Sequence, residues 1–450
     1  MHHPEPGCTA CETITCLANQ LLFWEFVRSG WAGLCRDPLA NADGRIESVK
    51  LGPILKAAMR NRPLQFVLLI GVMSFFADFV YEGARSVTGP YLAVLGASAT
   101  LVGLIAGLGE MLGYGLRLVS GLVSERTGEF WPITIFGYVV QMSAVPLLAV
   151  ANTWQWAACL IVLERVGRAI RNPPRDVMLS HAGKQVGLGW TFGLHEALDQ
   201  LGALSGPLVL AWILTRHSGY SLGFAVLAIP AAITIAILIF ARIVYPRPEE
   251  MEVHVPDVHG VGLGRTFWIY LIGAALVAAG FADFSLMAYH FQVSKVVSQA
   301  WIPIFYAVAM AVSGLGSLGF GKLFDRSGLW ILIPLTLLGA ASAPLAFLGH
   351  RWAVFVGCAV WGLGMGVHES IIPAAVATMV PQKRRPSAYG TFTAAYGISW
   401  FLGSVAIGKL YDLSLPALIG FSVAAQLAAI PLFLVAAHRT SKRAGNSVSG

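Results

Sequence analysis

Apolar runs of about twenty residues follow one another along most of this chain, and no other feature limits its fold so strongly. One helix needs about 20 apolar residues to cross the roughly 30 Å hydrocarbon core of a bilayer. Only 12% of the residues are charged, against roughly 25% in soluble domains. Backbone groups must pair internally in lipid, so the sequence predicts an all-α integral membrane protein with twelve transmembrane helices. The expected spans are 64–87, 99–119, 130–150, 154–172, 188–214, 219–244, 266–290, 300–320, 329–348, 352–373, 386–408 and 414–437.

The chain also repeats itself over a long period. The segment GLVSERTG at Gly121–Gly128 returns as GKLFDRSG at Gly321–Gly328, and each copy lies between two apolar runs. The tetrapeptide FADF likewise occurs at Phe76–Phe79 and Phe281–Phe284. So long a period indicates two large half-units rather than a solenoid of short repeats. We therefore predict two pseudo-symmetric six-helix bundles, a plan that many secondary transporters share.

The net charge of +7 is explained by topology. With a cytoplasmic N-terminus, basic residues concentrate in the inner segments, and this is the positive-inside bias of membrane proteins. Both termini are therefore expected in the cytoplasm, with anionic lipid heads and not nucleic acid as the partners of these residues. The outer segments hold only Arg85, Arg216, Lys295, Arg351 and Lys409.

The predicted organisation has five parts. Residues 1–60 form an N-terminal extension, 61–244 the first bundle, 245–264 a cytoplasmic linker, 265–438 the second bundle and 439–450 a cytoplasmic tail. The Cys-x2-Cys spacing in the extension suits a metal or redox module, but no second pair completes a site, so a tail without fixed structure is favoured and no metal is expected. Residues 14–34 fit an interfacial helix, and translation from Met59 would remove the extension. Its cysteines are Cys8, Cys11, Cys16 and Cys35.

Ionisable residues within the first two predicted helices are candidate site residues, because charge in a membrane is costly and usually faces a bundle interior. Asp78, Glu82 and Arg85 recur at i, i+4 and i+7 and so share a helix face. Asp78 is the first candidate for proton coupling, and a purely structural ion pair with Arg85 is the alternative. Glu110, on the next helix, is expected to face the same cavity.

The densest charged run, LERVGRAIRNPPRD, ends the fourth predicted helix. Glu164, Arg165 and Arg168 are expected within the membrane, and Arg165 or Arg168 beside Asp78, Glu110 or Asp199 would keep that carboxylate ionised. Arg171 and Arg175 are interpreted as anchors at the cytoplasmic surface. Pro173–Pro174 is predicted to end the helix, since neither residue has a backbone N–H.

The fifth predicted helix carries His195 and Asp199 at i, i+4. This spacing suits proton transfer, because histidine titrates near neutral pH, and an internal hydrogen bond that fixes the helix is the alternative. Farther along the helix, Gly202, Gly206 and Pro207 predict a bend or a tight crossing.

The second half is poorer in charge. Its polar candidates are Asp283 and Glu369. Its aromatic candidates are expected either to form an apolar surface for a substrate or simply to pack. These are Trp361, Tyr396 and Trp400.

The repeated loop resembles the signature G-x-x-x-D-R-x-G of the major facilitator superfamily, and the resemblance covers about residues 60–440. Glu125 replaces the usual Asp in the first copy. The resemblance implies alternating access, with each loop acting as a cytoplasmic gate in which the acid meets a helix start in the other half and the basic end of the fourth helix. Glu125 is thus expected near Arg168, Arg171 or Arg175. The matching residues are Gly121, Glu125, Arg126 and Gly128, then Gly321, Asp325, Arg326 and Gly328.

Together these features predict a proton-coupled secondary transporter of a small organic solute in the inner membrane of a prokaryote. The match of Gly202, Gly206 and Pro207 to an exporter signature of the family favours efflux. An uptake symporter or facilitator is the alternative, and a receptor-like or lipid-handling membrane protein is the alternative from another class. No enzyme motif was found. We expect a monomer that needs no cofactor and takes its energy from the proton gradient.

Overall fold

The computed structural model describes residues 62–186, 188–217, 219–247, 264–368, 372–380 and 385–448. The N-terminal extension with its cysteines, most of the predicted linker and Glu369 lie outside the described residues. The first half comprises α4 (Arg62–Val94), α5 (Ala99–Thr127), α6 (Phe130–Leu147), η2 (Leu148–Val150), α7 (Trp154–Val186), α8 (Leu188–Arg216), α9 (Ser221–Val226) and α10 (Ala228–Val244). The second half comprises α11 (Arg265–Gly280), α12 (Phe284–Ser294), α13 (Trp301–Ser327), η4 (Gly328–Ile331), α14 (Leu332–Ala340), α15 (Ser342–Leu348), α16 (Arg351–Gly366), α17 (Ile372–Met379), α18 (Arg385–Leu413) and α19 (Leu415–Val448).

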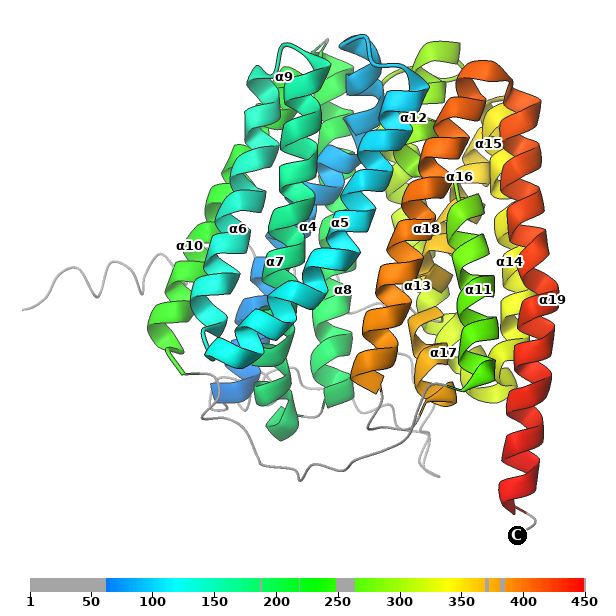
Figure 1. Cartoon of the computed structure of the whole chain (residues 1–450). Coiled ribbons are helices and arrows are strands. Elements are labelled where there is room, and N and C mark those ends of the chain that lie inside the picture. The colour runs from blue at the N-terminus through cyan, green and yellow to red at the C-terminus, as the bar shows by residue number, and fades with distance from the viewer. Residues whose placement is uncertain are drawn as a thin grey trace, which may run out of the picture. The chain divides into compact units, whose positions relative to one another are not determined.

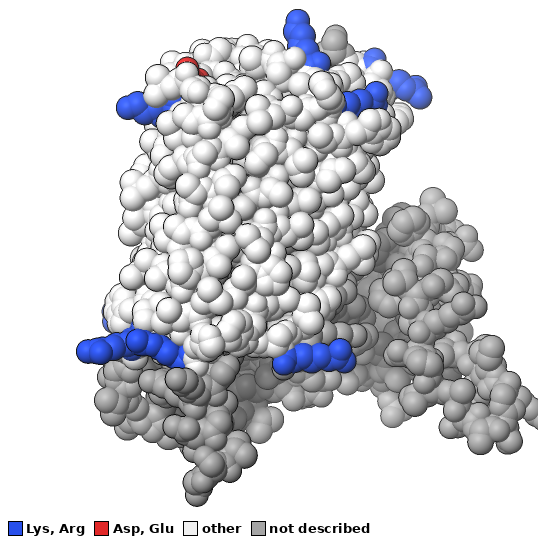
Figure 2. All heavy atoms as spheres, turned by 90° about the vertical axis from the view of Figure 1, so that its right-hand side faces the viewer, with Lys and Arg blue, Asp and Glu red and all other residues white. Residues whose placement is uncertain are grey.

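The described elements are all helical, and most run side by side in one direction or its reverse (Figure 1). Nine helical segments of the described ranges are long and apolar enough to cross a membrane. The face in Figure 2 shows a band free of charged atoms between Lys and Arg at both ends, as expected of a surface in contact with lipid. Two further apolar helices are shorter, at 301–317 and 351–366, and α7 carries the charged run. The count of twelve and the cytoplasmic termini stay predictions.

The fourth predicted helix does not end at its prolines. Helix α7 is 33 residues long and includes Pro173 and Pro174, so this prediction was wrong. A proline in a helix leaves the carbonyl four residues earlier without its usual donor. For Pro174 that carbonyl belongs to Ile170, and the Ser120 hydroxyl on α5 donates to it at 2.6 Å. A side chain from the neighbouring helix thus replaces a missing backbone bond, which the chain of α7 alone could not reveal.

The seventh predicted helix is interrupted. The seventh divides into α11 and α12 at Phe281–Asp283, and Asp283 caps α12 by accepting a hydrogen bond from the Ser285 N–H at 3.0 Å. In the tenth, α16 runs to Gly366, π-helical residues follow at 367–368, and α17 begins at Ile372 beyond residues that the structure does not describe. Interrupted helices in a membrane bundle are tolerated where side chains satisfy the freed backbone groups. Here the Trp361 indole donates to the Ala282 carbonyl at 2.8 Å and so satisfies one of them.

The predicted glycine crossing joins α8 to α4. A Cβ at Gly202 would overlap the carbonyl oxygen of Phe75, and one at Gly206 would overlap that of Phe79. The two backbones are therefore in direct contact, as small residues allow in membrane helix pairs. Of the bend and the tight crossing left open by the sequence, this is the tight crossing.

The two halves meet where α5 lies along α18, α8 along α13, and α4 along α12. One set of contacts between the halves lies at the end of the helical bundle where α9 is found (top of Figure 1). There the Asp412 carboxylate of α18 accepts hydrogen bonds from both the backbone N–H and the hydroxyl of Thr100, at 2.9 and 2.5 Å. Tyr220 donates to Gln292 at 3.2 Å across the same end. We call this the α9 end, and its contacts hold the halves together there.

We expect Gly206→Ala to destabilise the protein by about 1–3 kcal/mol, because α4 and α8 must separate to admit the methyl group. The matched control is Gly193→Ala on the same helix, where an added Cβ meets nothing within 4 Å, so the change adds only the helix preference of alanine. Thermal unfolding of the purified protein in detergent measures both. Equal melting temperatures for the two variants would contradict the packing assigned to Gly206.

Candidate functional site

Helices α4, α5, α7 and α8 direct charged side chains into the first half, where most are buried. Burial of unpaired charge is costly, so each such group is expected to have a partner. We call this set the charged network. Its acids are Asp78, Glu82, Glu110, Glu164 and Asp199, and its bases are Arg85, Arg165, Arg168, Arg171, Arg175 and His195.

Glu110 is shared by two arginines. One carboxylate oxygen lies 3.1 Å from Arg85 and 3.1 Å from Arg165. The Tyr81 hydroxyl accepts from the same two guanidinium groups, from Arg85 at 3.0 Å, and its two lone pairs allow this. The expected pairing of Arg165 with Glu110 is therefore confirmed, whereas Arg85 pairs with Glu110 rather than with Asp78.

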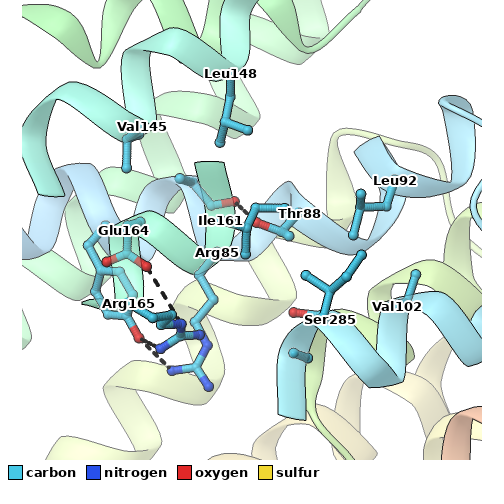
Figure 3. Close-up of a pocket in the computed structure, with 14 residues that line it drawn as sticks. Arg85, Thr88, Leu92, Val102, Val145, Leu148, Ile161, Glu164, Arg165 and Ser285 are labelled. Carbon is cyan, nitrogen blue, oxygen red and sulfur yellow. Dashed lines mark hydrogen bonds and ion pairs between the residues drawn. The ribbon is translucent and has the colours of Figure 1, made fainter. Parts of the chain in front are cut away.

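A small cavity of about 20 Å³ adjoins these arginines. Figure 3 shows Glu164, Arg165 and Arg85 on one side of it and Leu148 and Val145 on another. This volume is enough for about one or two water molecules. An organic solute would need a wider conformation of this cavity.

A glutamine links two side chains that lie about two turns apart on α7. The Gln141 amide on α6 donates to Glu164 at 2.8 Å and accepts from the Arg171 guanidinium at 2.5 Å. Arg171 also donates to the Tyr138 hydroxyl at 2.7 Å and lies 3.6 Å from Asp78. Sequence reasoning missed Tyr138 and Gln141, although a glutamine in an apolar run was a usable signal.

A second chain of contacts leads from α7 to α8. Arg175 donates to the Ser74 hydroxyl at 3.2 Å, and Ser74 lies within hydrogen-bond distance, 2.9 Å, of His195. The other ring nitrogen of His195 is 3.3 Å from Asp199, as the i, i+4 spacing predicted. The second carboxylate oxygen of Asp199 is buried and has no hydrogen-bond partner among the described residues.

Two contacts carry the charged network into the second half. Arg85 lies 3.9 Å from Asp283, which caps α12. The Tyr306 hydroxyl on α13 donates to the Glu82 carboxylate. The second half therefore supplies one acid and one phenol, while the other members belong to the first.

The aromatic candidates lie together in the second half. Phe281 stacks on Trp361 with ring centroids 5.7 Å apart, and Tyr396 meets Trp400 edge to face at 5.9 Å. The Tyr396 hydroxyl pairs with His368. The Trp400 indole N–H is buried without a hydrogen-bond partner among the described residues. The group reaches the first half through Tyr114, whose ring centroid is 5.6 Å from that of Tyr396.

The loop residues lie apart from this network. Glu125 and Arg126 are exposed, and Gly128 takes the left-handed conformation, φ 69°, that ends α5. Arg171 and Arg175 are buried beside Asp78 and Ser74, so the interpretation of them as surface anchors was wrong. The side chain of Asp325 and the chain before α18 lie outside the described residues, as does Gly321 beyond its place in α13. The cytoplasmic gate formed by these loops, including Arg326 and Gly328, stays a prediction.

These groups can bind charged solutes and hold or pass protons. Carboxylates, guanidinium groups, one imidazole and several phenols are the chemistry available. Within the described ranges, no three His, Cys, Asp or Glu side chains gather as a metal site would require.

Comparison with known proteins gives consistent results. The sequence profile of the Major Facilitator Superfamily matches residues 70–404. An uncharacterized protein of Mycobacterium tuberculosis is 40% identical over 81% of this chain and 91% of its own length. Multidrug resistance protein MdtH of Edwardsiella ictaluri is 29% identical over 34% of this chain and 36% of its own. The crystal structure of nucleoside transporter NupG matches with a TM-score of 0.62 and 13% identity, covering 84% of this chain and 98% of that one.

We expect Asp78→Asn and Arg171→Gln each to destabilise the protein by about 3–5 kcal/mol, because each leaves a buried charge without its partner. The double variant should cost clearly less than the sum, since it removes both charges. Unfolding of all variants in lipid bicelles completes this double-mutant cycle.

The control is Glu129→Gln, whose side chain is exposed and makes no hydrogen bond to the start of α6. A surface substitution of this kind usually changes stability by no more than about 0.5 kcal/mol. Simple additivity of the Asp78 and Arg171 changes would contradict the ion pair.

Proposed function

This chain belongs to the major facilitator superfamily, and on that premise we propose that it is a proton-coupled secondary transporter that exports a small organic solute by alternating access. Because this family consists of multi-pass membrane transporters, we take the protein to be a transporter and not an enzyme. Coupling, direction and solute are the proposed parts. We place the protein in the inner membrane of a prokaryote, as a monomer with both termini in the cytoplasm and without nucleic acid as a partner.

One observation carries the proposal of proton coupling. Asp199 is partly buried, and among the described residues its only polar partner is His195 at 3.3 Å, while its second oxygen is buried and has none. A carboxylate in this state is neutralised by a proton at little structural cost. By contrast, Asp78, Glu110 and Glu164 pair with arginines, and Glu82 accepts a hydrogen bond from Tyr306. We therefore place Asp199 ahead of Asp78 as the group that takes up and releases the proton.

The neighbours of Asp199 support a path for that proton. His195 adjoins Ser74, and Ser74 accepts a hydrogen bond from Arg175. Imidazole and hydroxyl groups both donate and accept protons. Arg171 holds Asp78 at 3.6 Å on the same α4 face, so a proton on Asp199 alters the field at the Asp78–Arg171 pair.

The halves are joined in a way that fits alternating access. Arg85 near Asp283 and Tyr306 on Glu82 connect the charged network to the second half. Changes of charge in the first half can therefore alter the free energy of contact between the halves. This is the physical requirement for coupling protonation to a conformational change.

Export is the direction that we favour. The glycine–proline segment of α8, which matches the family's exporter signature, forms the tight crossing with α4, and the relative MdtH is described as a multidrug resistance protein. Uptake is the alternative, and the sign of the proton movement during solute flux distinguishes the two.

We expect Asp199→Asn to abolish proton movement driven by the solute while solute exchange across the membrane continues. The amide keeps the shape of the carboxyl group and removes its proton site. The measurement uses proteoliposomes with an enclosed pH-sensitive dye, a panel of small organic solutes, and Glu129→Gln, an exposed acid outside the charged network, as the control that keeps wild-type behaviour.

The outcomes separate the proposals. Unchanged coupling in Asp199→Asn would remove this residue from the mechanism and return attention to Asp78. Solute flux in the wild type without any proton movement would indicate a facilitator. Solute binding without flux in any direction would indicate a receptor-like protein.

A further inference from the structure

Two arginines of the first half have a buried Nε atom and no acidic partner among the described residues. Arg168 on α7 and Arg117 on α5 have no hydrogen bond or ion pair to a described residue, and the Nε atom of each is buried. The other buried arginines nearby, Arg85, Arg165 and Arg171, are each paired with carboxylates. Asp78, Glu82 and Glu164 act on Arg168 only from beyond ion-pair distance.

Both unpaired arginines line one cavity. It lies between α5 and α7, measures about 20 Å³, and is bounded by Glu110, Tyr114, Arg117, Arg165 and Arg168, with Gly109, Gly113 and Ala169. Three guanidinium groups thus face a single carboxylate, and that carboxylate already pairs with Arg85 and Arg165. Among the residues that line the cavity, positive charge therefore exceeds negative charge.

Aromatic rings hold the two arginines in place. The Arg168 guanidinium carbon lies 4.1 Å from the centroid of the Tyr81 ring, and that of Arg117 lies 5.6 Å from the Tyr114 ring. Such stacking orients a guanidinium group while leaving its N–H donors free for another ligand. A planar fork of donors matches the two oxygens of a carboxylate or the oxygens of a phosphate.

The surroundings also indicate what is attached to the anion. Glycines at positions 109 and 113 leave one wall of the cavity without side chains. Tyr114 forms another wall, and its ring meets Tyr396 of the aromatic group in the second half. An anionic group between the arginines would thus have aromatic surface on the side toward the other half. The space fits two oxygen-sized groups, so only the anionic head is held in this conformation.

We propose that Arg117 and Arg168 bind the anionic group of the transported solute, which makes the solute an organic anion with an apolar or aromatic body. This inference rests on the proposed transport function, since it names the solute class for the same cavity. It gives Arg117 and Arg168 the role of anion ligands, whereas Arg85 and Arg165 belong to the internal network around Glu110.

The test measures thermal stabilisation of the full-length purified protein in an uncharged detergent. The probes are benzoate, phenyl phosphate, benzyl alcohol and benzylamine, which share one ring and differ in the charge of the attached group. We expect stabilisation by benzoate or phenyl phosphate, and none by the alcohol or the amine. Equal or greater stabilisation by benzylamine, or none by either anion, would overturn the proposal.

Variants locate the binding site. Arg168→Gln and Arg117→Gln should each weaken anion binding about tenfold or more, the loss expected for a charge-assisted hydrogen bond. Arg168→Lys keeps the positive charge but lacks the planar fork of N–H donors, so it should retain part of the affinity for the anion. Arg216→Gln, at the exposed end of α8, is the matched control and should bind as the wild type does. Wild-type affinity in both Arg168→Gln and Arg117→Gln would refute the assignment. If one variant folds poorly, wild-type affinity in the other variant refutes it.

A last measurement distinguishes a lipid head group from a free solute as the source of the anion. It also tests the anion site separately from proton-coupled transport. If phosphatidylglycerol alone, and neither free anion, gives stabilisation that depends on Arg168, the cavity holds a lipid head group and the assignment to solute is wrong. If benzoate or phenyl phosphate binds through Arg168 but moves no protons in proteoliposomes, the anion site stands and proton-coupled transport fails.

Discussion

The sharing of one carboxylate by two arginines is the contact on which the rest of the first half depends. Glu110 neutralises part of the charge of Arg85 and Arg165 at once, and Tyr81 accepts from both. Charge within a membrane is retained only where partners offset the loss of water. With Glu110 occupied in this way, Arg117 and Arg168 are left over, and the cavity between α5 and α7 gains its positive character.

Much of this could be predicted from the sequence, because the signals were local. The apolar runs and the repeated loop indicated the family, and helical spacing placed His195 beside Asp199. The pairing of Arg165 with Glu110 was one of several that the sequence left open. Glycines at four-residue spacing predicted the crossing of α8, since only small residues let two helix backbones touch.

The remainder depended on partners from distant helices, which one sequence does not disclose. Pro173 and Pro174 are locally strong signals for a helix end, and a single hydroxyl from Ser120 overrides part of their effect. Arg171 resembled a surface anchor by its position in the charged run, yet Gln141 and Tyr138 of α6 bury it. The break before α12 likewise followed from a cap and an indole contact, not from apolar periodicity.

The glycine contact between α4 and α8 has a kinematic consequence. With no side chain between Gly202 or Gly206 and the carbonyl oxygens of α4, neither helix can slide or rotate past the other without steric overlap. Relative sliding of α4 and α8 is therefore sterically costly. Their close contact holds Ser74 of α4 within hydrogen-bond distance of His195 of α8, beside Asp199.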